Sequence, residues 1–367
     1  MIPILYSEKE ITETKGTTTY ASSFGIGALT EATQCTVTEV RNGSYECSLI
    51  YPTSGMYSSK LKVDSIIRAK PNPNDPTQFF RVYGYSKPIN GTIKYNLKHI
   101  SNDLKYVVLP DFSTPNLNGF KALSEALSYS KYGITINTGF SCSSDVTDYT
   151  YTGYNSAINC DTPINVKAVL YDKILAAFET PTHQIEYHFN NFNIGLHKQR
   201  GTDTGLVVRY GGDIKECDID IDVSEVYNRV LPYCIQNGVC YIGDYSELGN
   251  YGDSSFVKTI EIDVGEYVTG SAPTMTQVSQ AYSDWARYNS SPCAEIENIT
   301  LDISTNSQLK NVSLCDIITV NIAPYNLNFK TKIVQTTYNC LTETYESIEI
   351  GNVRPTLSGI ITGGSIK

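Results

Sequence analysis

Residues 63–100, VDSIIRAKPNPNDPTQFFRVYGYSKPINGTIKYNLKHI, and residues 314–350, LCDIITVNIAPYNLNFKTKIVQTTYNCLTETYESIEI, share one order of segments. In each stretch an aspartate, Asp64 or Asp316, stands just before an apolar isoleucine pair. A turn rich in Pro or Asn follows, and then two alternating runs separated by a second turn. Alternation with period two predicts half-buried strands, and clusters of Pro, Asn and Gly predict reversals. Each stretch is therefore predicted to form a three-stranded meander.

The two meanders share few identical side chains. The pattern fits a structural duplication, but it also fits two unrelated meanders that follow the same rules of strand and turn formation. The sequence leaves both interpretations open.

Composition favours a large, mainly β protein. Only 18% of the 367 residues are charged, whereas tyrosine alone contributes 28. Tyrosine is common in strands and in protein interfaces. The net charge of −10 and the pI of 5.0 argue against tight nucleic-acid binding, which needs clustered Lys and Arg. The acidic balance would serve solubility, or a wall along which DNA passes without sticking.

The ten cysteines contain no CxxC pair, and we expect them to be reduced and mostly buried. The start MIPILYSEKE lacks the features of a signal peptide. No apolar run is long enough to span a bilayer. We therefore expect a soluble protein made in the cytoplasm, with no membrane anchor.

The first part of the chain, residues 1–112, is predicted to be all β. Its clearest element is the hairpin CTVTEVRNGSYECSLIYP, in which Asn42-Gly43 would supply the positive φ angles of a type I′ turn.

Residues 113–200 are predicted to form an α/β insert. A first helix lies in LNGFKALSEALSYSK, with Phe120, Leu123, Ala126 and Leu127 at helical spacing. A second lies in DTPINVKAVLYDKILAAFE, capped by Asp161 or Thr162 and opened by Pro163. Its predicted packing face consists of Val166, Val169, Leu170, Ile174 and Ala177. The run HQIEYHFNNFNIGLHKQ then alternates like a strand.

Strand-like sequence returns from residue 201. A third helix, TMTQVSQAYSDWARYN, follows Pro273 and carries the single tryptophan, Trp285. We assign residues 266–299 to this helical segment and residues 359–367 to a Gly/Ser-rich linker.

No catalytic, cofactor-binding or metal-binding residue is predicted. His183 and His188 stand in an alternating run, which sends them to opposite faces instead of to one metal. The run of Asp213, Asp218, Asp220 and Asp222 lacks the Gly and Glu of an EF-hand loop, because Val223 and Arg229 stand at those places. The segment GFSCS, residues 139–143, lacks the second glycine of a nucleophile elbow. No single Cys–His pair is selected by the sequence.

Several collinear blocks carry a family resemblance. They are MIPILY, the hairpin above, AKPNPNDPTQFFRVYGYSKPINGTIKYNLKHISNDL, RGTDTGLVVRYGGDIKE, VSLCDIITV and YESIEIGNVRPTL. Together they resemble the N-terminal region of phage minor structural proteins, also called tail-associated lysin or prophage endopeptidase tail proteins. These proteins form the baseplate hub or tail tip of siphophages and resemble in fold the hub proteins of contractile-tailed phages.

The resemblance implies a fold and an assembly. It implies two related, tail-tube-like β-barrels, the first at 1–112 and a discontinuous second at 201–265 and 300–358. It also implies a homotrimer, since a trimer matches a six-fold tube only if each chain carries two equivalent docking surfaces. Implied partners are the distal tail protein, tail tube proteins and the tape measure protein, with transient passage of DNA and no specific nucleic-acid binding.

The function expected from these observations is structural. The chain would be a virion protein of the tail tip that caps the tube, anchors distal components and opens for DNA. Many relatives continue into a C-terminal peptidoglycan hydrolase or receptor-binding extension, but no residue here matches a peptidase motif. The alternatives are the N-terminal part of a cell-wall endopeptidase and a carbohydrate-binding tail protein, the latter because tyrosines can stack on sugars.

Overall fold

The first predicted meander forms three strands, and the residues before it add further strands and a short helix. The protein is represented by a computed structural model that describes residues 1–14, 24–87, 90–114, 118–147, 158–178, 184–222, 227–248, 256–286, 296–303, 308–323 and 327–351. The first elements are β1 (Ile4–Tyr6), α1 (Glu8–Thr14), β2 (Gly27–Ala28), β3 (Gln34–Val40), β4 (Tyr45–Pro52), β5 (Ile66–Ala69), β6 (Gln78–Ser86) and β7 (Thr92–His99).

The second meander also forms three strands, joined by strands from earlier in the chain. These elements are β15 (Asp203–Arg209), β16 (Ile214–Asp222), β21 (Ile296–Ile303), η6 (Gln308–Asn311), β22 (Ile317–Ile322), β23 (Leu327–Asn339) and β24 (Thr344–Gly351).

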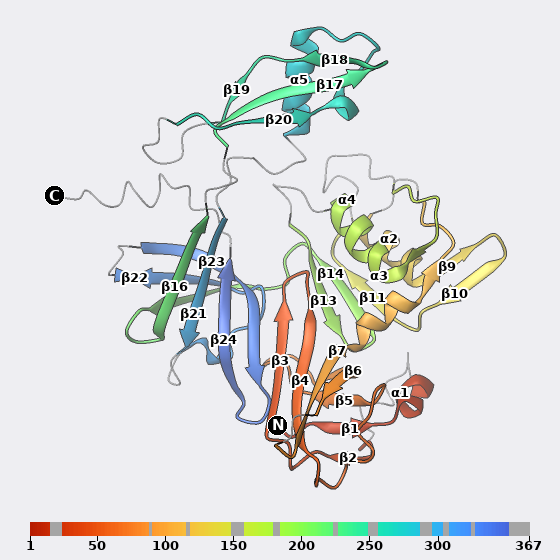
Figure 1. Ribbon diagram of the computed structural model, residues 1–367, viewed down its shortest axis with the longest axis vertical. Coiled ribbons are helices and arrows are strands. Elements are labelled where there is room, and N and C mark those ends of the chain that lie inside the picture. Colours follow the sequence, from red (N-terminus) through yellow and green to blue (C-terminus); the bar gives the residue numbers. More distant parts are fainter. Residues whose placement is uncertain are drawn as a thin grey trace.

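Both sets of strands belong to one 13-stranded sheet (Figure 1). Its order is β16-β21-β24-β23-β3-β4-β7-β6-β5-β1-β2, with β22 on β23 and β15 on β22. The strands up to β7 and those from β15 onward are here called the first and second repeat. Within them, β3-β4-β7-β6-β5 runs in the same spatial order as β16-β21-β24-β23-β22. The sixth strands differ, because β1 pairs antiparallel to β5 whereas β15 pairs parallel to β22.

The pairing registers of the two repeats coincide. Ile66 of β5 pairs with Arg81 of β6, and Ile317 of β22 pairs with Lys332 of β23. The following pairs advance in step along both ladders. Because a slip of one residue would exchange the two faces of a sheet, an identical register means identical inward and outward positions.

A β-bulge stands at the same place in both repeats. The register of β6 with β7 shifts just after Val82, and that of β23 with β24 shifts just after Ile333. Bulges re-aim a strand and are specific features of a fold. Their coincidence, together with the shared register, favours duplication over two unrelated meanders.

The turn before each meander repeats as well, with one correction to the sequence alignment. Asp64 and Cys315 have positive φ angles of 68° and 72°. The next side chain in each case, Ser65 or Asp316, accepts a hydrogen bond from the backbone N–H three residues earlier, at 3.1 and 2.8 Å. Asp64 therefore corresponds to Cys315, and Asp316 corresponds to Ser65. The isoleucine pairs were aligned correctly, but the two aspartates were not.

The predicted first hairpin is confirmed, but its turn type is different. β3 and β4 pair antiparallel, and the N–H of Gly43 donates to the carbonyl of Val40 at 3.0 Å. The turn is thus centred on Arg41-Asn42, and Asn42 has a φ of 49°. A type I′ turn on Asn42-Gly43 would require a positive φ at Gly43, and Gly43 does not have one.

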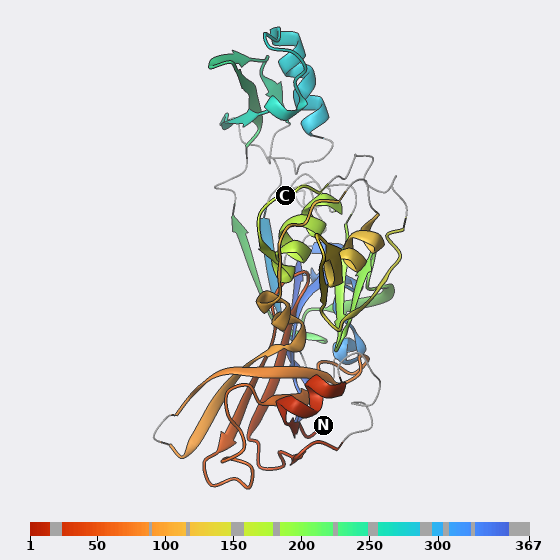
Figure 2. The same ribbon diagram turned by 90° about the vertical axis from the view of Figure 1, so that its right-hand side faces the viewer.

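The predicted α/β insert contains helices and small sheets beside the first repeat (Figure 2). Its core and that of the first repeat are one continuous cluster, which extends from Leu5 to Leu196 and includes Cys340. Its elements are η2 (Ile100–Tyr106), β8 (Val108–Leu109), α2 (Gly119–Leu127), β9 (Ser128–Lys131), β10 (Ile134–Asn137), β11 (Ser141–Ser144), β12 (Ile164–Asn165), α3 (Val166–Ala168), the π-helix η4 (Val169–Leu175), α4 (Ala176–Phe178), β13 (Glu186–Asn190) and β14 (Asn193–His197).

Two details of the predicted helices differ. Phe120 is 38% exposed, whereas the other three predicted apolar positions of α2 are buried. The second helix begins at Val166 and is capped by Asn165, whose side chain accepts from the N–H of Ala168 at 2.9 Å. The expected caps at Asp161 and Thr162 do not act there, because the intervening residues 164–165 pair with β8.

Residues 227–286 form a module with its own sheet and core. It consists of β17 (Arg229–Gln236), β18 (Val239–Ile242), β19 (Ser246–Glu247), β20 (Thr259–Asp263), η5 (Gly265–Tyr267) and α5 (Met275–Trp285). α5 is the predicted third helix, with a capping box between Thr274 and Gln277. The module stands at the top of Figure 1, past the ends of β16 and β21.

This module corrects part of the assignment of residues 201–265 to the second barrel, because residues 227–265 lie outside the large sheet whereas β15 and β16 belong to it. β17 to β20 pair only with one another in the described chain, and they pack on α5 instead of joining the large sheet. β3–β4 and β16–β21 are equivalent hairpins, since Val37 pairs with Cys47 and Ile219 with Ile299. The module is therefore an insertion at the turn of the second hairpin.

Neither repeat closes into a barrel over the described residues. The hydrogen-bonded path ends at β16 on one side and at β2 on the other. The mainly β fold is confirmed, and the predicted barrel closure is not. Among the described helices, none has the length and apolarity needed to cross a membrane. The predicted linker at 359–367 lies outside the described residues.

Candidate assembly interface

The two repeats meet along β23, which is long enough to serve both. Its first part pairs with β22 as far as Lys332, while its second part, from Gln335 to Asn339, pairs with β3. Its other edge pairs with β24. The contact of β23 with β3 is here called the internal junction. It joins a central strand of the second repeat to the edge strand of the first.

The internal junction is well packed on the core side. Thr336 and Tyr338 are 1% and 2% exposed. On the opposite face, the hydroxyls of Thr38 and Thr337 lie 3.4 Å apart. Paired strands with buried side chains on one face hold their register firmly, so the internal junction fixes the two repeats relative to each other.

A buried carboxylate, Glu186 of β13, ties the insert to both repeats. It accepts hydrogen bonds from Arg41 Nε at 2.9 Å, from Lys332 Nζ at 2.5 Å and from the backbone N–H of Arg200 at 2.6 Å. Its side chain is 0% exposed. Burial raises the pKa of Glu186, but the bonds from Lys332, Arg200 and Arg41 outweigh this and hold its pKa below the ordinary value.

Arg200 joins a second group of charges beside Glu186. Its guanidinium lies 2.6 Å from Glu39 of β3 and 3.3 Å from Asp75. Burial raises the pKa of Glu39, and the charge of Arg200 opposes that rise. The whole network therefore contains three cations and three anions, namely Arg41, Arg200, Lys332, Glu39, Asp75 and Glu186. Buried charges need such pairing.

The network has a structural role. Its members come from the first repeat, the insert and the second repeat, and each is held by another charged member of the network. Such an arrangement locks three parts of the chain together, because breaking one pair leaves a partner buried and unpaired.

Of the two histidines considered as metal ligands, only His188 lies among the described residues. His183 lies outside the described residues, and His188 Nε2 is 3.7 Å from Asp75 Oδ1. Burial, together with the charge of Arg200, lowers the pKa of His188 to about 4, although Asp75 opposes this. A search of the described residues for three or more His, Cys, Asp or Glu that could hold a metal finds none.

The acidic run and the GFSCS segment lie on strands. Asp218, Asp220 and Asp222 belong to β16, as the alternation predicted, and Asp213 precedes it. Ser141 and Cys142 belong to β11, which pairs with β14. Burial raises the pKa of the Cys142 thiol, which disfavours the thiolate that a nucleophile needs.

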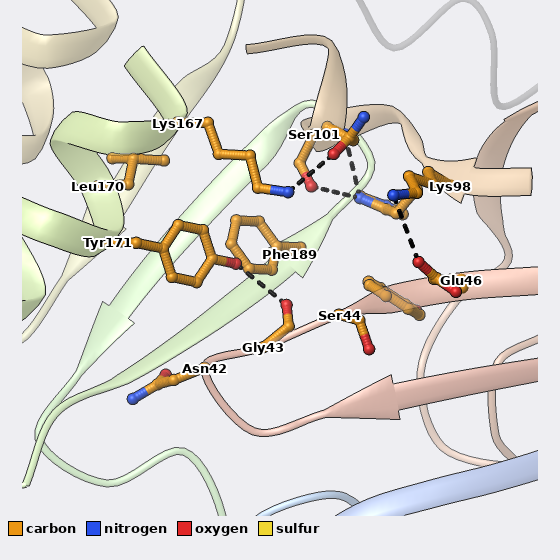
Figure 3. A pocket seen from close by; sticks show the side chains of 13 residues that line it. Asn42, Gly43, Ser44, Glu46, Lys98, Ser101, Lys167, Leu170, Tyr171 and Phe189 are labelled. Atoms are coloured by element: carbon orange, nitrogen blue, oxygen red, sulfur yellow. Dashed lines mark hydrogen bonds and ion pairs between the residues drawn. The ribbon is translucent and has the colours of Figure 1, made fainter. Parts of the chain in front are cut away.

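A cavity of about 250 Å³ lies between the first repeat and the insert (Figure 3). Lys98 lies 3.6 Å from Glu46, and Lys167 donates to Asn102 at 2.8 Å. Burial and the neighbouring positive charges of Lys98 and Lys105 lower the pKa of Lys167. Polar groups in the lining are thus engaged with one another.

His99 also borders this cavity and is held neutral. Its Nδ1 accepts from the N–H of Ser101 at 3.2 Å, and its Nε2 lies 3.2 Å from Gln78 Oε1, to which it donates. Burial lowers the pKa of His99 to about 3. This ring supports the core; it stacks on Tyr45 at 4.5 Å.

Sequence reasoning missed the charge network entirely. Glu186 and Lys332 lie in separate alternating runs, and their types are common on strands. The one local signal was a charged residue at an inward position, since Glu39 falls in step with the buried Val37. A charge at an inward strand position predicts a buried partner, but it does not name the partner.

The comparisons with known proteins agree with the fold. Residues 202–361 match the model of the prophage endopeptidase tail family. Prophage tail protein gp18 from Listeria monocytogenes EGD-e superposes with a TM-score of 0.54 at 11% identity, over 99% of this chain and 98% of that one. The 43 kDa tail protein of prophage MuSo2 from Shewanella oneidensis gives 0.59 at 11% identity, over 97% and 99%. A chain of the Francisella PdpA–VgrG complex gives 0.50 at 11% identity, over 89% and 50%.

No curated protein sequence matches the chain. At these low identities the solved structures establish the fold alone, and the family assignment rests on the matched residues. The resemblance predicted from the sequence is confirmed. Residues 202–361 thus match the prophage endopeptidase tail family, and the chain as a whole has the fold of the prophage tail proteins named above.

Proposed function

We propose that the protein is a tail-tip hub of a phage or prophage, in which three copies form a ring that caps the tail tube. The observation that carries this proposal is the duplication, with its shared strand order, register and bulge. A chain with two equivalent strand frames offers two equivalent docking surfaces. Three such chains offer six, which suits a six-fold tube.

The proposed hub works by assembly and opening, without bond chemistry. The net charge of −10 suits a surface that DNA passes without binding. Distal tail, tail tube and tape measure proteins are the proposed partners, and the virion tail tip is the proposed location. The α/β insert and the module of residues 227–286 would brace the two repeats from outside.

The proposed absence of enzymatic activity rests on the chemistry of the described side chains. Burial raises the pKa values of the Cys35, Cys47, Cys234 and Cys315 thiols, which favours their neutral form, and His99 is hydrogen-bonded to Gln78. Purified protein incubated with Gram-positive peptidoglycan should release no muropeptides. Clear release above a heat-inactivated control would instead establish the endopeptidase that the family description mentions.

The trimer is tested by size-exclusion chromatography with light scattering at tens of micromolar. We expect a mass of three chains, or a mass that rises toward three chains with concentration. A strict monomer both alone and when mixed with purified tail tube protein would refute the hub.

A further inference from the structure

Two strand edges are equivalent, through the duplication, to the edges of β3 and β23 that meet at the internal junction, and neither is paired there in the described chain. The counterpart of β3 is β16, whose outer edge has no strand partner among the described residues. The counterpart of the second part of β23 is the end of β6. β5 pairs with one edge of β6 only as far as Arg81, which lies opposite Ile66, and β7 pairs with the other edge. Beyond Arg81, the first edge of β6 has no strand partner among the described residues.

Exposure marks the end of β6 as an incomplete counterpart. Thr336 and Tyr338 of the internal junction are 1% and 2% exposed, as noted above. The residues at the same register positions are Tyr85 of β6, which is 44% exposed, and Lys87 just after β6, which is also exposed. An exposed strand edge with a large aromatic side chain is a ready template for another strand.

We propose that the end of β6 in one copy pairs with β16 of a second copy, which repeats the internal junction between chains. This inference rests on the proposed trimeric hub and names the surface through which it assembles. In a ring of three chains, three internal junctions alternate with three such contacts. Figure 1 shows β16 and the β6–β7 hairpin on opposite sides of the sheet, as a head-to-tail ring requires.

The register of the internal junction fixes which residues meet. Thr337 pairs with Thr38 there, and the equivalent positions are Ser86 in β6 and Asp220 in β16. Ser86 of one copy is thus placed opposite Asp220 of the next. One position to either side, Tyr85 meets Ile221 and Lys87 meets Ile219.

Charge complementarity supports a second copy as the occupant. β16 has carboxylates at alternate positions, including Asp220 and Asp222. On the β6 side, Ser86 pairs with Lys94 of β7, which is exposed. Opposite charges in neighbouring positions of a sheet favour pairing, and they also set its direction.

The hydrogen bonds of the internal junction make a sharp test possible. Arg41 N–H donates to Val334 at 2.7 Å and Cys340 N–H donates to Cys35 at 2.8 Å. These two bonds place Thr38 and Thr337 in a pair without mutual hydrogen bonds, the type with the shorter Cα separation of about 4.5 Å. Cysteines at such a pair can form a disulfide.

The test is the double variant Ser86→Cys/Asp220→Cys, oxidised with diamide and examined on a non-reducing denaturing gel. We expect covalent trimers that reduce back to monomers. Each single variant should give no trimer. The off-register control Asn96→Cys/Asp220→Cys uses a residue one strand further into the sheet and should also stay monomeric.

The outcomes separate this inference from the hub proposal. A wild-type trimer in solution without cross-links in the double variant overturns the β6–β16 contact and leaves the hub intact. A ladder extending past three chains confirms the contact but overturns the closed trimer. A monomeric wild type without cross-links overturns both.

Moving the carboxylate from Asp220 to position 86 tests the same contact without cysteines. Ser86→Asp places two carboxylates opposite each other, and we expect each contact to weaken roughly fivefold. Over three contacts the trimer association constant should fall on the order of 100-fold. Adding Asp220→Ser should restore it. Failure of the restored pair to recover association, with the monomer folded by circular dichroism, would refute the pairing.

Discussion

Glu186→Gln should destabilise the protein more than most single substitutions. Glu186 receives three hydrogen bonds, two of them from the cations Arg41 and Lys332, whose side chains are 19% and 11% exposed. Glutamine keeps the shape and one acceptor oxygen but removes the charge. Both cations then stay buried without the anion they share.

The expected loss of stability follows from the free energy needed to keep a buried charge without a partner. Breaking a buried ion pair by removing one partner costs about 3–5 kcal/mol. Because the glutamine carbonyl can still accept one bond, we take the lower end, about 3 kcal/mol. In a folding unit of this size, that corresponds to a fall in melting temperature of about 6–12 °C.

Urea and thermal unfolding, followed by circular dichroism, measure this effect. The matched control is Glu343→Gln, which also removes a carboxylate from an ion pair. Glu343 is 63% exposed and lies 2.7 Å from the amino group of Met1, so its loss should cost less than about 1 kcal/mol. If the two variants shifted the midpoint equally, the network would not be the lock that we infer.

The pH dependence of the Glu186→Gln effect gives an independent check. The pKa of Glu186 is lowered from its ordinary value of 4.5. The stability it contributes is therefore fully present above pH 4.5 and is lost as the pH falls through the lowered value. The difference between wild type and variant should stay constant from pH 7 to 5. A difference that vanished already at pH 6 would contradict the assignment.

Two further predictions concern buried polar side chains. The pKa of His99 is lowered from 6.5 to about 3 and that of His188 to about 4, so both rings stay neutral in the folded chain. The free energy of unfolding should therefore fall as the pH drops from 6.5 toward 4. Each histidine should contribute up to about 1.4 kcal/mol per pH unit to this fall. Urea titrations at several pH values measure the slope, which His99→Gln should reduce. Asn42→Ala removes side-chain bonds to the carbonyl of Ile185 at 2.8 Å and from the N–H of Tyr187 at 2.9 Å, and should cost about 2–3 kcal/mol in urea unfolding. Asn90→Ala, on an exposed turn, is the control, and an equal loss there would refute this role for Asn42.

Local patterns predicted most of the strands correctly. Alternation identified β3, β4, β6, β7, β16, β23 and β24. In β4 and β7 the buried residues follow that alternation, because one face of each strand packs on the core. The isoleucine pairs also marked equivalent positions of the two repeats. Details that depend on neighbouring segments were less predictable. The cap at Asn165 replaced Asp161 or Thr162 because residues before it joined a strand.

Long-range pairing was beyond local patterns. β17 to β20 alternate like other strands, and nothing in their residues says that they form a separate sheet on α5. The alignment of Asp64 with Asp316 failed for a related reason. A left-handed residue is specified by the turn around it, and Cys315 occupies that place without any of the usual preference for Asn, Asp or Gly.

The sequence by itself determined the mainly β class, the two meanders and the resemblance to a family. These depend on period-two alternation and on collinear blocks, which are properties of neighbouring residues. Only the tertiary structure decided that β23 spans both repeats, that Glu186 meets Arg41 and Lys332, and that the edges of β6 and β16 stay unpaired in the described chain. The physical reason is that strand edges and buried charges are satisfied by partners far away in the chain, and no local pattern records which partner that will be.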